Sequence, residues 1–248
     1  MASNTQTFIA YEGPSLYDGS PIVVLIQTGS TNRKTGDMVQ TYILRSDIDP
    51  ITASRTGEDK SICGTCPHMG TPNPDSDKGQ ASDRTCYVTL AHGPLGKYKA
   101  YKAGRYSKVQ GHDAIRALGL GRMVRLGTYG DPAAVPQYIW DSLISAAQGW
   151  TAYTHGAINP APDKIMTSAE SASQAESAWQ RGERTFRVIK GLESLIKGKE
   201  VLCPASEEAG QRVQCESCKL CAGSSVKAKS VAIVAHGIAK RKAKEIVQ

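Results

Sequence analysis

The sequence has few aromatic residues and no apolar run long enough to cross a bilayer. Phe, Trp and Tyr make up 6% of the chain, which argues against a surface that stacks single-stranded bases. The first seven residues are polar and contain no basic stretch followed by an apolar one, so we expect no secretory signal and no membrane partner. A G-x-S-x-G elbow, a P-loop and an H-E-x-x-H helix are also missing, which disfavours a metal-free hydrolase.

These absences leave a cytoplasmic protein as the expectation, and the cytosol is reducing. Seven cysteines, an odd number, are then unlikely to form a disulfide framework. Their spacing is not scattered, because all of them fall into two groups, whereas buried core cysteines would spread along the chain. The sequence therefore predicts metal binding through clustered thiolates.

The C-terminal group contains Cys203, Cys215, Cys218 and Cys221, which read C-x11-C-x2-C-x2-C. Four thiolates complete a tetrahedral zinc site or a four-iron cluster without further ligands. The C-x2-C-x2-C core has a ferredoxin-like spacing and favours iron–sulfur, whereas zinc more often uses two separated pairs. Zinc remains the alternative.

The N-terminal group supplies only three thiolates, from Cys63, Cys66 and Cys86. In one interpretation His68 joins them to make a closed zinc site. In the other, the three cysteines hold a four-iron cluster with one iron left open, which is what a cluster needs to bind a small molecule. A single connected site of all seven cysteines is less favoured.

Strand-like and helix-like segments alternate from residue 86 onward, which predicts parallel βα units. Before them, two β-branched runs joined by a turn-rich connection predict an N-terminal hairpin, and residues 47–83 are expected to be mostly loop. Strands are expected over 21–27, 38–45, 123–128, 150–154, 164–167, 185–189, 201–202 and 230–235. Helices are expected over 94–106, 112–118, 133–148, 171–181 and 191–197.

The fold class that follows is α/β: a partial or irregular (β/α) barrel with an N-terminal β-hairpin and cysteine-rich metal-binding loops. We expect the hairpin segment in residues 1–60, the βα-repeat domain with both cysteine groups in 61–240, and a basic tail in 241–248. Polar residues follow four of the expected strands: Asp131, His155, Glu170 and His236. Since ligands of parallel α/β folds bind at the carboxyl ends of the strands, these four are candidates for a shared catalytic site. Alternatively, each caps the turn that follows, as Asp131 before Pro132 would.

Two local features resemble those of radical S-adenosylmethionine enzymes. The first is a three-cysteine cluster whose last cysteine precedes an aromatic residue, here Cys86 and Tyr87. The second is a strand that runs into a Gly-acid-Pro turn, here Gly127 to Pro132 with Gly130 and Asp131 inside it. The usual spacing of that family is C-x3-C-x2-C, against C-x2-C-x19-C here, and its turn has Glu and is two residues shorter.

The resemblance implies that the N-terminal thiolates hold an open four-iron cluster and that the C-terminal four hold an auxiliary cluster. It also implies that Tyr87, Gly127, Gly130 and Asp131 surround S-adenosylmethionine, with a partial TIM barrel as the scaffold. The sequence further resembles a group of uncharacterised phage- and plasmid-borne proteins, through landmarks such as CxxCPH, YGDP, AYTH and TSAES. That likeness implies a bacterial host cytoplasm.

The net charge of +7 permits other partners. A zinc-stapled protein, in which structural zinc sites stabilise the fold, could bind nucleic acid through its basic stretches. Such charge is equally typical of a solvated helix face. A phage protein could also bind and modulate a host complex, and an interface of that kind leaves no motif. The two basic stretches comprise Lys97, Lys99, Lys102, Arg105 and Lys108, and Lys227, Lys229, Lys240, Arg241, Lys242 and Lys244.

Overall fold

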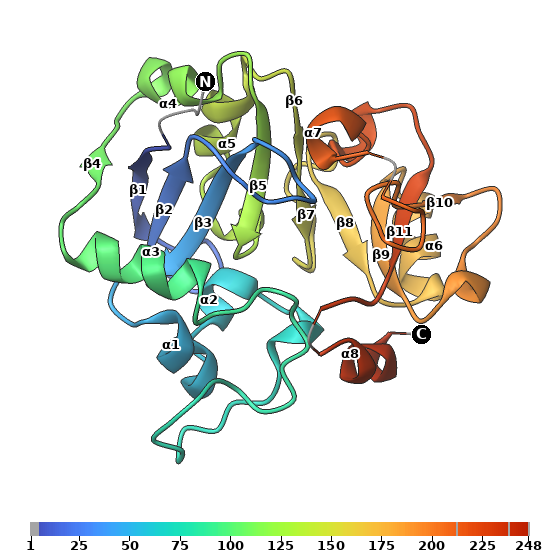
Figure 1. Ribbon diagram of the computed structural model, residues 1–248, viewed down its shortest axis with the longest axis horizontal. Coiled ribbons are helices and arrows are strands. Elements are labelled where there is room, and N and C mark those ends of the chain that lie inside the picture. Colours follow the sequence, from blue (N-terminus) through green and yellow to red (C-terminus); the bar gives the residue numbers. More distant parts are fainter. Residues whose placement is uncertain (1–4, 212, 238, 248) are drawn as a thin grey trace.

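The computed structural model describes residues 5–211, 213–237 and 239–247, and it has a mixed α/β fold with two sheets (Figure 1). Met1–Asn4 and Gln248, at the ends of the polar N-terminus and of the expected basic tail, lie outside the described residues. The first sheet has the strand order β4-β1-β2-β3-β5-β6 and the second β10-β11-β9-β8-β7. The α/β class is therefore confirmed.

The first sheet combines an antiparallel N-terminal part with parallel strands. β2 pairs antiparallel with β3 from Ile22–Arg45 to Gln27–Gln40, which confirms the expected hairpin. β3 then pairs in parallel with β5, and β5 with β6. β1, which the sequence did not predict, pairs antiparallel with β2. The strands are β1 (Thr7–Pro14), β2 (Pro21–Gln27), β3 (Val39–Arg45), β4 (Ser107–Lys108), β5 (Met123–Tyr129) and β6 (Gly149–Thr151).

The second sheet is parallel throughout its described pairs. It begins one residue after the first sheet ends, because only Ala152 separates β6 from β7, so the single strand expected over 150–154 contributes to both sheets. β11 lies between β9 and β10 although it follows both in the sequence. The strands are β7 (Tyr153–Thr154), β8 (Met166–Ala169), β9 (Thr185–Ile189), β10 (Glu200–Leu202) and β11 (Ser230–Val234).

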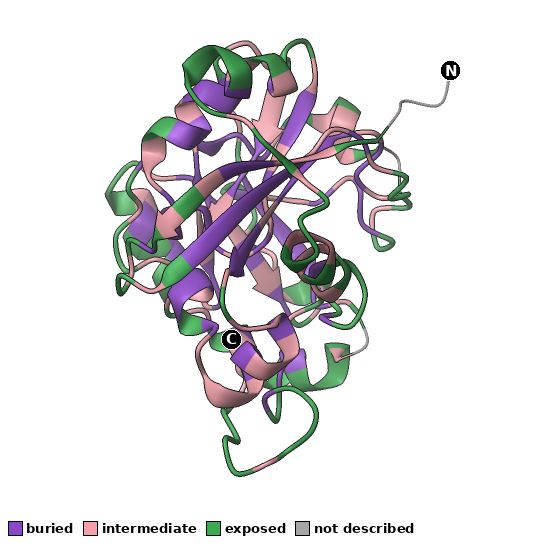
Figure 2. Ribbon diagram, turned by 90° about the vertical axis from the view of Figure 1, so that its left-hand side faces the viewer, coloured by how far each residue is buried: buried purple, intermediate pink, exposed green. Residues whose placement is uncertain are grey.

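Most strand residues are buried, and helices pack around the two sheets (Figure 2). α5 buries Trp140 and Leu143 in the core of the first sheet, where β2 is buried from Ile22 to Ile26. No helix of the described residues is long and apolar enough to cross a membrane. The helices are α1 (Pro50–Thr56), α2 (Lys60–Cys63), α3 (Gly93–Lys102), α4 (His112–Gly119), α5 (Gln137–Ile144), α6 (Ala172–Gln180), α7 (Cys215–Cys218) and α8 (Lys240–Ile246).

Two expected helices need correction. Residues 47–83 are mostly loop, as expected, but they also contain α1, α2 and the 3₁₀ turn Pro67–Met69. The Asp49 side chain accepts hydrogen bonds from the amides of Ile51 and Thr52, and Gly57 ends α1 in the left-handed conformation (φ +81°). The helix expected over 133–148 is shorter, since Pro136 separates the 3₁₀ turn Pro132–Ala134 from α5. The helix expected over 191–197 is only a 3₁₀ turn, Leu192–Ser194.

One buried ion pair ties β9 to the edge strand β10. Nε and Nη2 of Arg187 donate to the two carboxylate oxygens of Glu200, each at 2.7 Å. Both side chains are almost completely buried, at 1% and 0% exposure. Removing one partner of such a pair lowers the free energy of unfolding strongly, because the remaining buried charge is neither paired nor solvated by water.

We therefore expect the substitution Arg187→Met to lower the free energy of unfolding by about 3–5 kcal/mol, measured by urea denaturation. The double variant Arg187→Met/Glu200→Met should lose much less, because it leaves no unpaired buried charge. Equal losses in the single and double variants would contradict this assignment.

Candidate functional site: a cysteine-lined cavity between the two sheets

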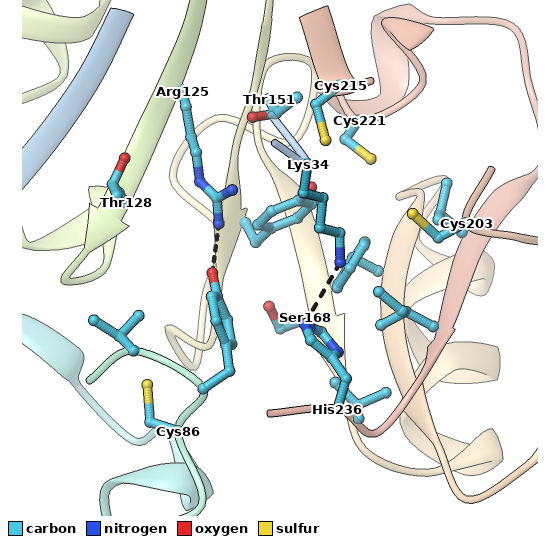
Figure 3. A pocket seen from close by; sticks show the side chains of 18 of the residues that line it. Lys34, Cys86, Arg125, Thr128, Thr151, Ser168, Cys203, Cys215, Cys221 and His236 are labelled. Carbon is cyan, nitrogen blue, oxygen red and sulfur yellow. Dashed lines mark hydrogen bonds between the residues drawn. The ribbon is translucent and has the colours of Figure 1, made fainter. Parts of the chain in front are cut away.

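A cavity of about 370 Å³ lies between the sheets and is lined by side chains from both. Strands contribute inward-facing residues such as Arg125 of β5, Thr151 of β6 and Ser168 of β8 (Figure 3). Residues from both cysteine groups reach it from opposite sides, with Cys86 on one side and Cys203, Cys215 and Cys221 on the other. All seven cysteines line this one cavity: Cys63, Cys66, Cys86, Cys203, Cys215, Cys218 and Cys221.

The N-terminal group is assembled by hydrogen bonds between backbone atoms. Cys63 ends α2, and the amide of Cys66 donates to its carbonyl at 3.2 Å. The His68 carbonyl accepts from the amides of Thr85 and Cys86, at 3.2 and 3.0 Å. These hydrogen bonds bring the end of the nineteen-residue connection back to its beginning, and so place Cys86 beside the C-x2-C pair.

The C-terminal group is held to two distant parts of the chain. The amides of Cys215 and Glu216 on α7 donate to the carbonyls of Lys34 and Thr35, in the connection between β2 and β3, at 3.0 and 3.1 Å. The carbonyl of Cys221 accepts from the amide of Ala152 at 3.0 Å. These hydrogen bonds therefore fix the α7 segment to the connection that precedes β3 and to the residue that follows β6, and these two strands are the outer members of the parallel part of the first sheet.

The cysteines are free thiols in an environment that disfavours their charge. Burial raises the pKa of Cys63, of Cys86 and of Cys215, and raises the pKa of Cys221 to about 12. Thiols of this kind are protonated at neutral pH unless a cation is bound, so metal binding here must release protons.

Each cysteine group has an arginine beside it, of which Arg84 is buried and Arg125 half-buried. Arg84 pairs with Asp59 at 3.3 Å and interacts with the Cys63 and Cys86 thiols, while Arg125 interacts with the C-terminal group. Burial outweighs the attraction of Arg84 and raises the pKa of Asp59 to about 6, which still leaves the pair charged at neutral pH. These guanidinium groups can partly neutralise the negative charge of a thiolate-bound metal centre.

Four polar side chains lie between the two cysteine groups. Tyr87, almost half exposed to the cavity, stacks on His236 with ring centroids 5.4 Å apart, and its hydroxyl contacts Nη2 of Arg125. Lys34 Nζ lies 3.5 Å from Nε2 of His236. Burial and the charge of Lys34 lower the pKa of His236, so the ring is neutral and Nε2 can accept from the ammonium. Nε of Arg125 is buried and has no hydrogen-bond partner.

The Gly-acid-Pro turn reaches the cavity at the end of β5. Gly127 and Gly130 have left-handed backbone angles (φ +69° and +85°), and a Cβ on Gly130 would lie 2.7 Å from Cβ of Ile43. Both glycines are therefore required by the turn itself. Asp131 uses both carboxylate oxygens on backbone amides, accepting from Ala133 at 2.9 Å and from His155 at 2.7 Å. Asp131 thus caps the 3₁₀ turn and also anchors His155.

His68, His155 and Glu170 form a compact group beside the N-terminal cysteines. Nε2 of His68 and Nε2 of His155 contact different oxygens of the Glu170 carboxylate, at 3.1 and 2.7 Å. Burial lowers the pKa of His155, but Cys66 and Glu170 outweigh it and raise that pKa well above its usual value. Burial raises the pKa of Glu170, and the two histidines more than offset this, so its pKa is lowered.

Three of the four residues expected at strand ends, Asp131, His155 and Glu170, therefore lie together, while His236 lies with Lys34 and Tyr87. His68 turns both ring nitrogens away from the thiols, since Nδ1 contacts Thr85 Oγ1 at 2.7 Å and Nε2 contacts Glu170. The sequence interpretation missed Lys34, Arg84 and Arg125. Arg125 had a usable signal, because it alternates with buried Val124 and Leu126 along a strand and so must face one side of the sheet.

No protein-family model matches this chain, no curated protein matches it, and no solved structure does. The function must therefore follow from the site itself.

The anchoring role of Asp131 can be tested by stability measurements. Asp131→Ala leaves the amides of Ala133 and His155 without their acceptor, and we expect the free energy of unfolding to fall by about 2–4 kcal/mol in urea denaturation. Asp131→Asn should lose less, because its amide oxygen still accepts one of the two bonds. A stability unchanged in Asp131→Ala would contradict the assignment.

Proposed function

We propose that this protein is an iron–sulfur enzyme of radical S-adenosylmethionine-like architecture, with a four-iron cluster at each end of one substrate cavity. The observation that carries the proposal is that all seven cysteines line the same cavity. Thiolates of purely structural metal sites form closed sites and do not need to line a common cavity. Two thiolate groups on opposite sides of a cavity suit chemistry on a molecule bound between them.

The thiols are not arranged as a preformed tetrahedral zinc site. A tetrahedral zinc site with bonds of about 2.3 Å brings its sulfurs to about 3.8 Å from one another. Among the described residues, which include every cysteine, no three thiol sulfurs lie within 4.8 Å of one another. A four-iron cluster holds its ligand sulfurs farther apart, because a cube of iron and sulfide lies between them.

The N-terminal group supports an open cluster. It supplies three thiols, and the side chain of His68 is engaged by Thr85 and Glu170 instead of completing a fourth ligand. The turn from Gly127 to Asp131 lines the cavity, and the Asp131 amide donates to the carbonyl of Ile62, next to Cys63, at 2.6 Å. In the proposed enzyme, this turn would hold the amino acid end of S-adenosylmethionine beside the three thiols.

The arrangement of strands supports a partial barrel. Parallel strands run from β3 through β5, β6 and β7 to β8, β9, β11 and β10, with the cavity on their inner side. Cluster and cofactor together would supply one-electron chemistry. The chain's own residues bind and orient the substrate: Arg125 and Lys34 offer positive charge, the Tyr87 ring offers a flat apolar face, and Asp131 fixes the backbone of His155.

A zinc-stapled nucleic-acid-binding protein receives less support. Lysines of the first basic stretch are engaged locally, since Lys97 donates to Thr7 at 2.8 Å and Lys102 to the Ser46 carbonyl at 3.3 Å. Lys242 of the tail pairs with Asp83. Neither this alternative nor modulation of a host protein accounts for a cavity lined by all the cysteines. A bacterial host cytoplasm, as the resemblance to phage proteins implies, would provide iron–sulfur assembly.

The first test is metal content. Protein purified anaerobically should be brown, absorb at ~400 nm and contain about eight irons per chain. Cys66→Ser and Cys218→Ser should each reduce the iron by about half, because each removes a ligand from one group only. Colourless protein with stoichiometric zinc would reject the proposal.

The second test concerns the open cluster. S-adenosylmethionine added to the dithionite-reduced protein should change the electron paramagnetic resonance spectrum of one cluster. The change should persist in Cys218→Ser, which retains the N-terminal group, and disappear in Cys66→Ser. An unchanged spectrum in iron-loaded wild-type protein would leave an iron–sulfur protein without the proposed cofactor.

A further inference from the structure

We infer that His68, His155 and Glu170 form a separate site for one divalent transition-metal ion, bound by two imidazole nitrogens and a carboxylate. This site goes beyond the proposed clusters, because it uses no thiolate and lies beside the N-terminal group. Two histidines and one carboxylate that leave other coordination positions open are a ligand set suited to ions such as Fe²⁺, Mn²⁺ or Co²⁺.

The ligand atoms already converge. Within the described residues, these three are the one group of three or more histidine, cysteine or acidic side chains whose ligand atoms all lie within 4.8 Å of one another. Metal–ligand bonds of about 2.1 Å place neighbouring ligand atoms about 3.0–3.4 Å apart. The two contacts to Glu170, at 3.1 and 2.7 Å, are already near that range, and the ligand atoms of the two histidines lie within 4.8 Å of each other.

The surroundings of His68 resemble those of a metal-bound histidine. Its Nδ1 lies 2.7 Å from Oγ1 of Thr85, a hydroxyl that can accept the ring proton. When the ring proton is on Nδ1, this bond leaves the Nε2 lone pair available to an ion placed between Nε2 and the Glu170 carboxylate, and it holds the ring toward Glu170. His68 and Glu170 are both buried, which limits competition from water.

The group can also be reached from outside. His155 and Glu170 line the main cavity and, in addition, a second cavity of about 450 Å³ on the side of α6. Polar side chains such as Ser173, Gln174 and Ser177 line that second cavity. An ion, and a small ligand in its open positions, therefore have an entry path that does not pass the cysteines.

The cleanest probe is Mn²⁺, which prefers nitrogen and oxygen ligands to thiolates. Anaerobic protein dialysed against EDTA should bind one Mn²⁺, seen as loss of the free-ion electron paramagnetic resonance signal. Electron spin echo modulation on the bound ion should detect nitrogen couplings from two imidazoles. This readout needs no substitution and no iron, so it can succeed or fail independently of the proposed function.

Substitutions then test the individual residues. Glu170→Gln and His68→Gln should abolish binding at Mn²⁺ concentrations that saturate the wild type, while Glu176→Gln, an exposed matched control on α6, should bind normally. Thr85→Val should weaken binding about 10–100-fold, and Thr85→Ser should restore it. Absence of binding to wild-type protein up to about 1 mM Mn²⁺, or a bound ion without imidazole couplings, would overturn the inference and leave the three residues as a hydrogen-bonded network.

Discussion

Ala152 connects the two sheets, because it lies between β6 of the first sheet and β7 of the second. Its carbonyl accepts from the amide of Met166 at the start of β8, and its amide donates to the carbonyl of Cys221. One extended segment thus leaves the first sheet, passes Ala152 and enters the second, so the inner faces of both sheets border the same space. The bond to Cys221 brings the C-terminal cysteines to this junction, and the end of β7 brings His155 to the N-terminal ones.

Several buried charged side chains lie against a partner that compensates their charge. Arg84 lies against Asp59, Glu170 against two histidines, and Arg187 against Glu200. Arg125 has no carboxylate partner among the described residues; its Nη2 contacts the Tyr87 hydroxyl, and its Nε, like that of Arg84, has no hydrogen-bond partner. Isolated charge of that kind is costly unless something else in the site balances it, and thiolate-bound metal or an anionic substrate would do so.

The sequence predicted those parts of the fold that have local causes. The β-branched run predicted the bounds of β2 correctly, whereas α1, with Pro50 at its start and Gly57 at its end, was not predicted. The grouping of Asp131, His155 and Glu170 followed from a rule about strand ends. The position of His68 could not be predicted in this way, because its partners Thr85 and Glu170 lie 17 and 102 residues away. Lys34 lies in the connection to which α7 is hydrogen-bonded, and this contact joins segments about 180 residues apart and leaves no pattern in the sequence.

The strand order of the second sheet has a consequence for how the protein is made. β11 lies between β9 and β10, and β10 has no other strand partner among the described residues. During synthesis, β10 therefore cannot join the sheet until residues 230–234 have been made. Until then Cys203, whose amide donates to the carbonyl of Ala232 in β11, lacks this anchor, so the C-terminal thiol group is completed late in the folding of the chain.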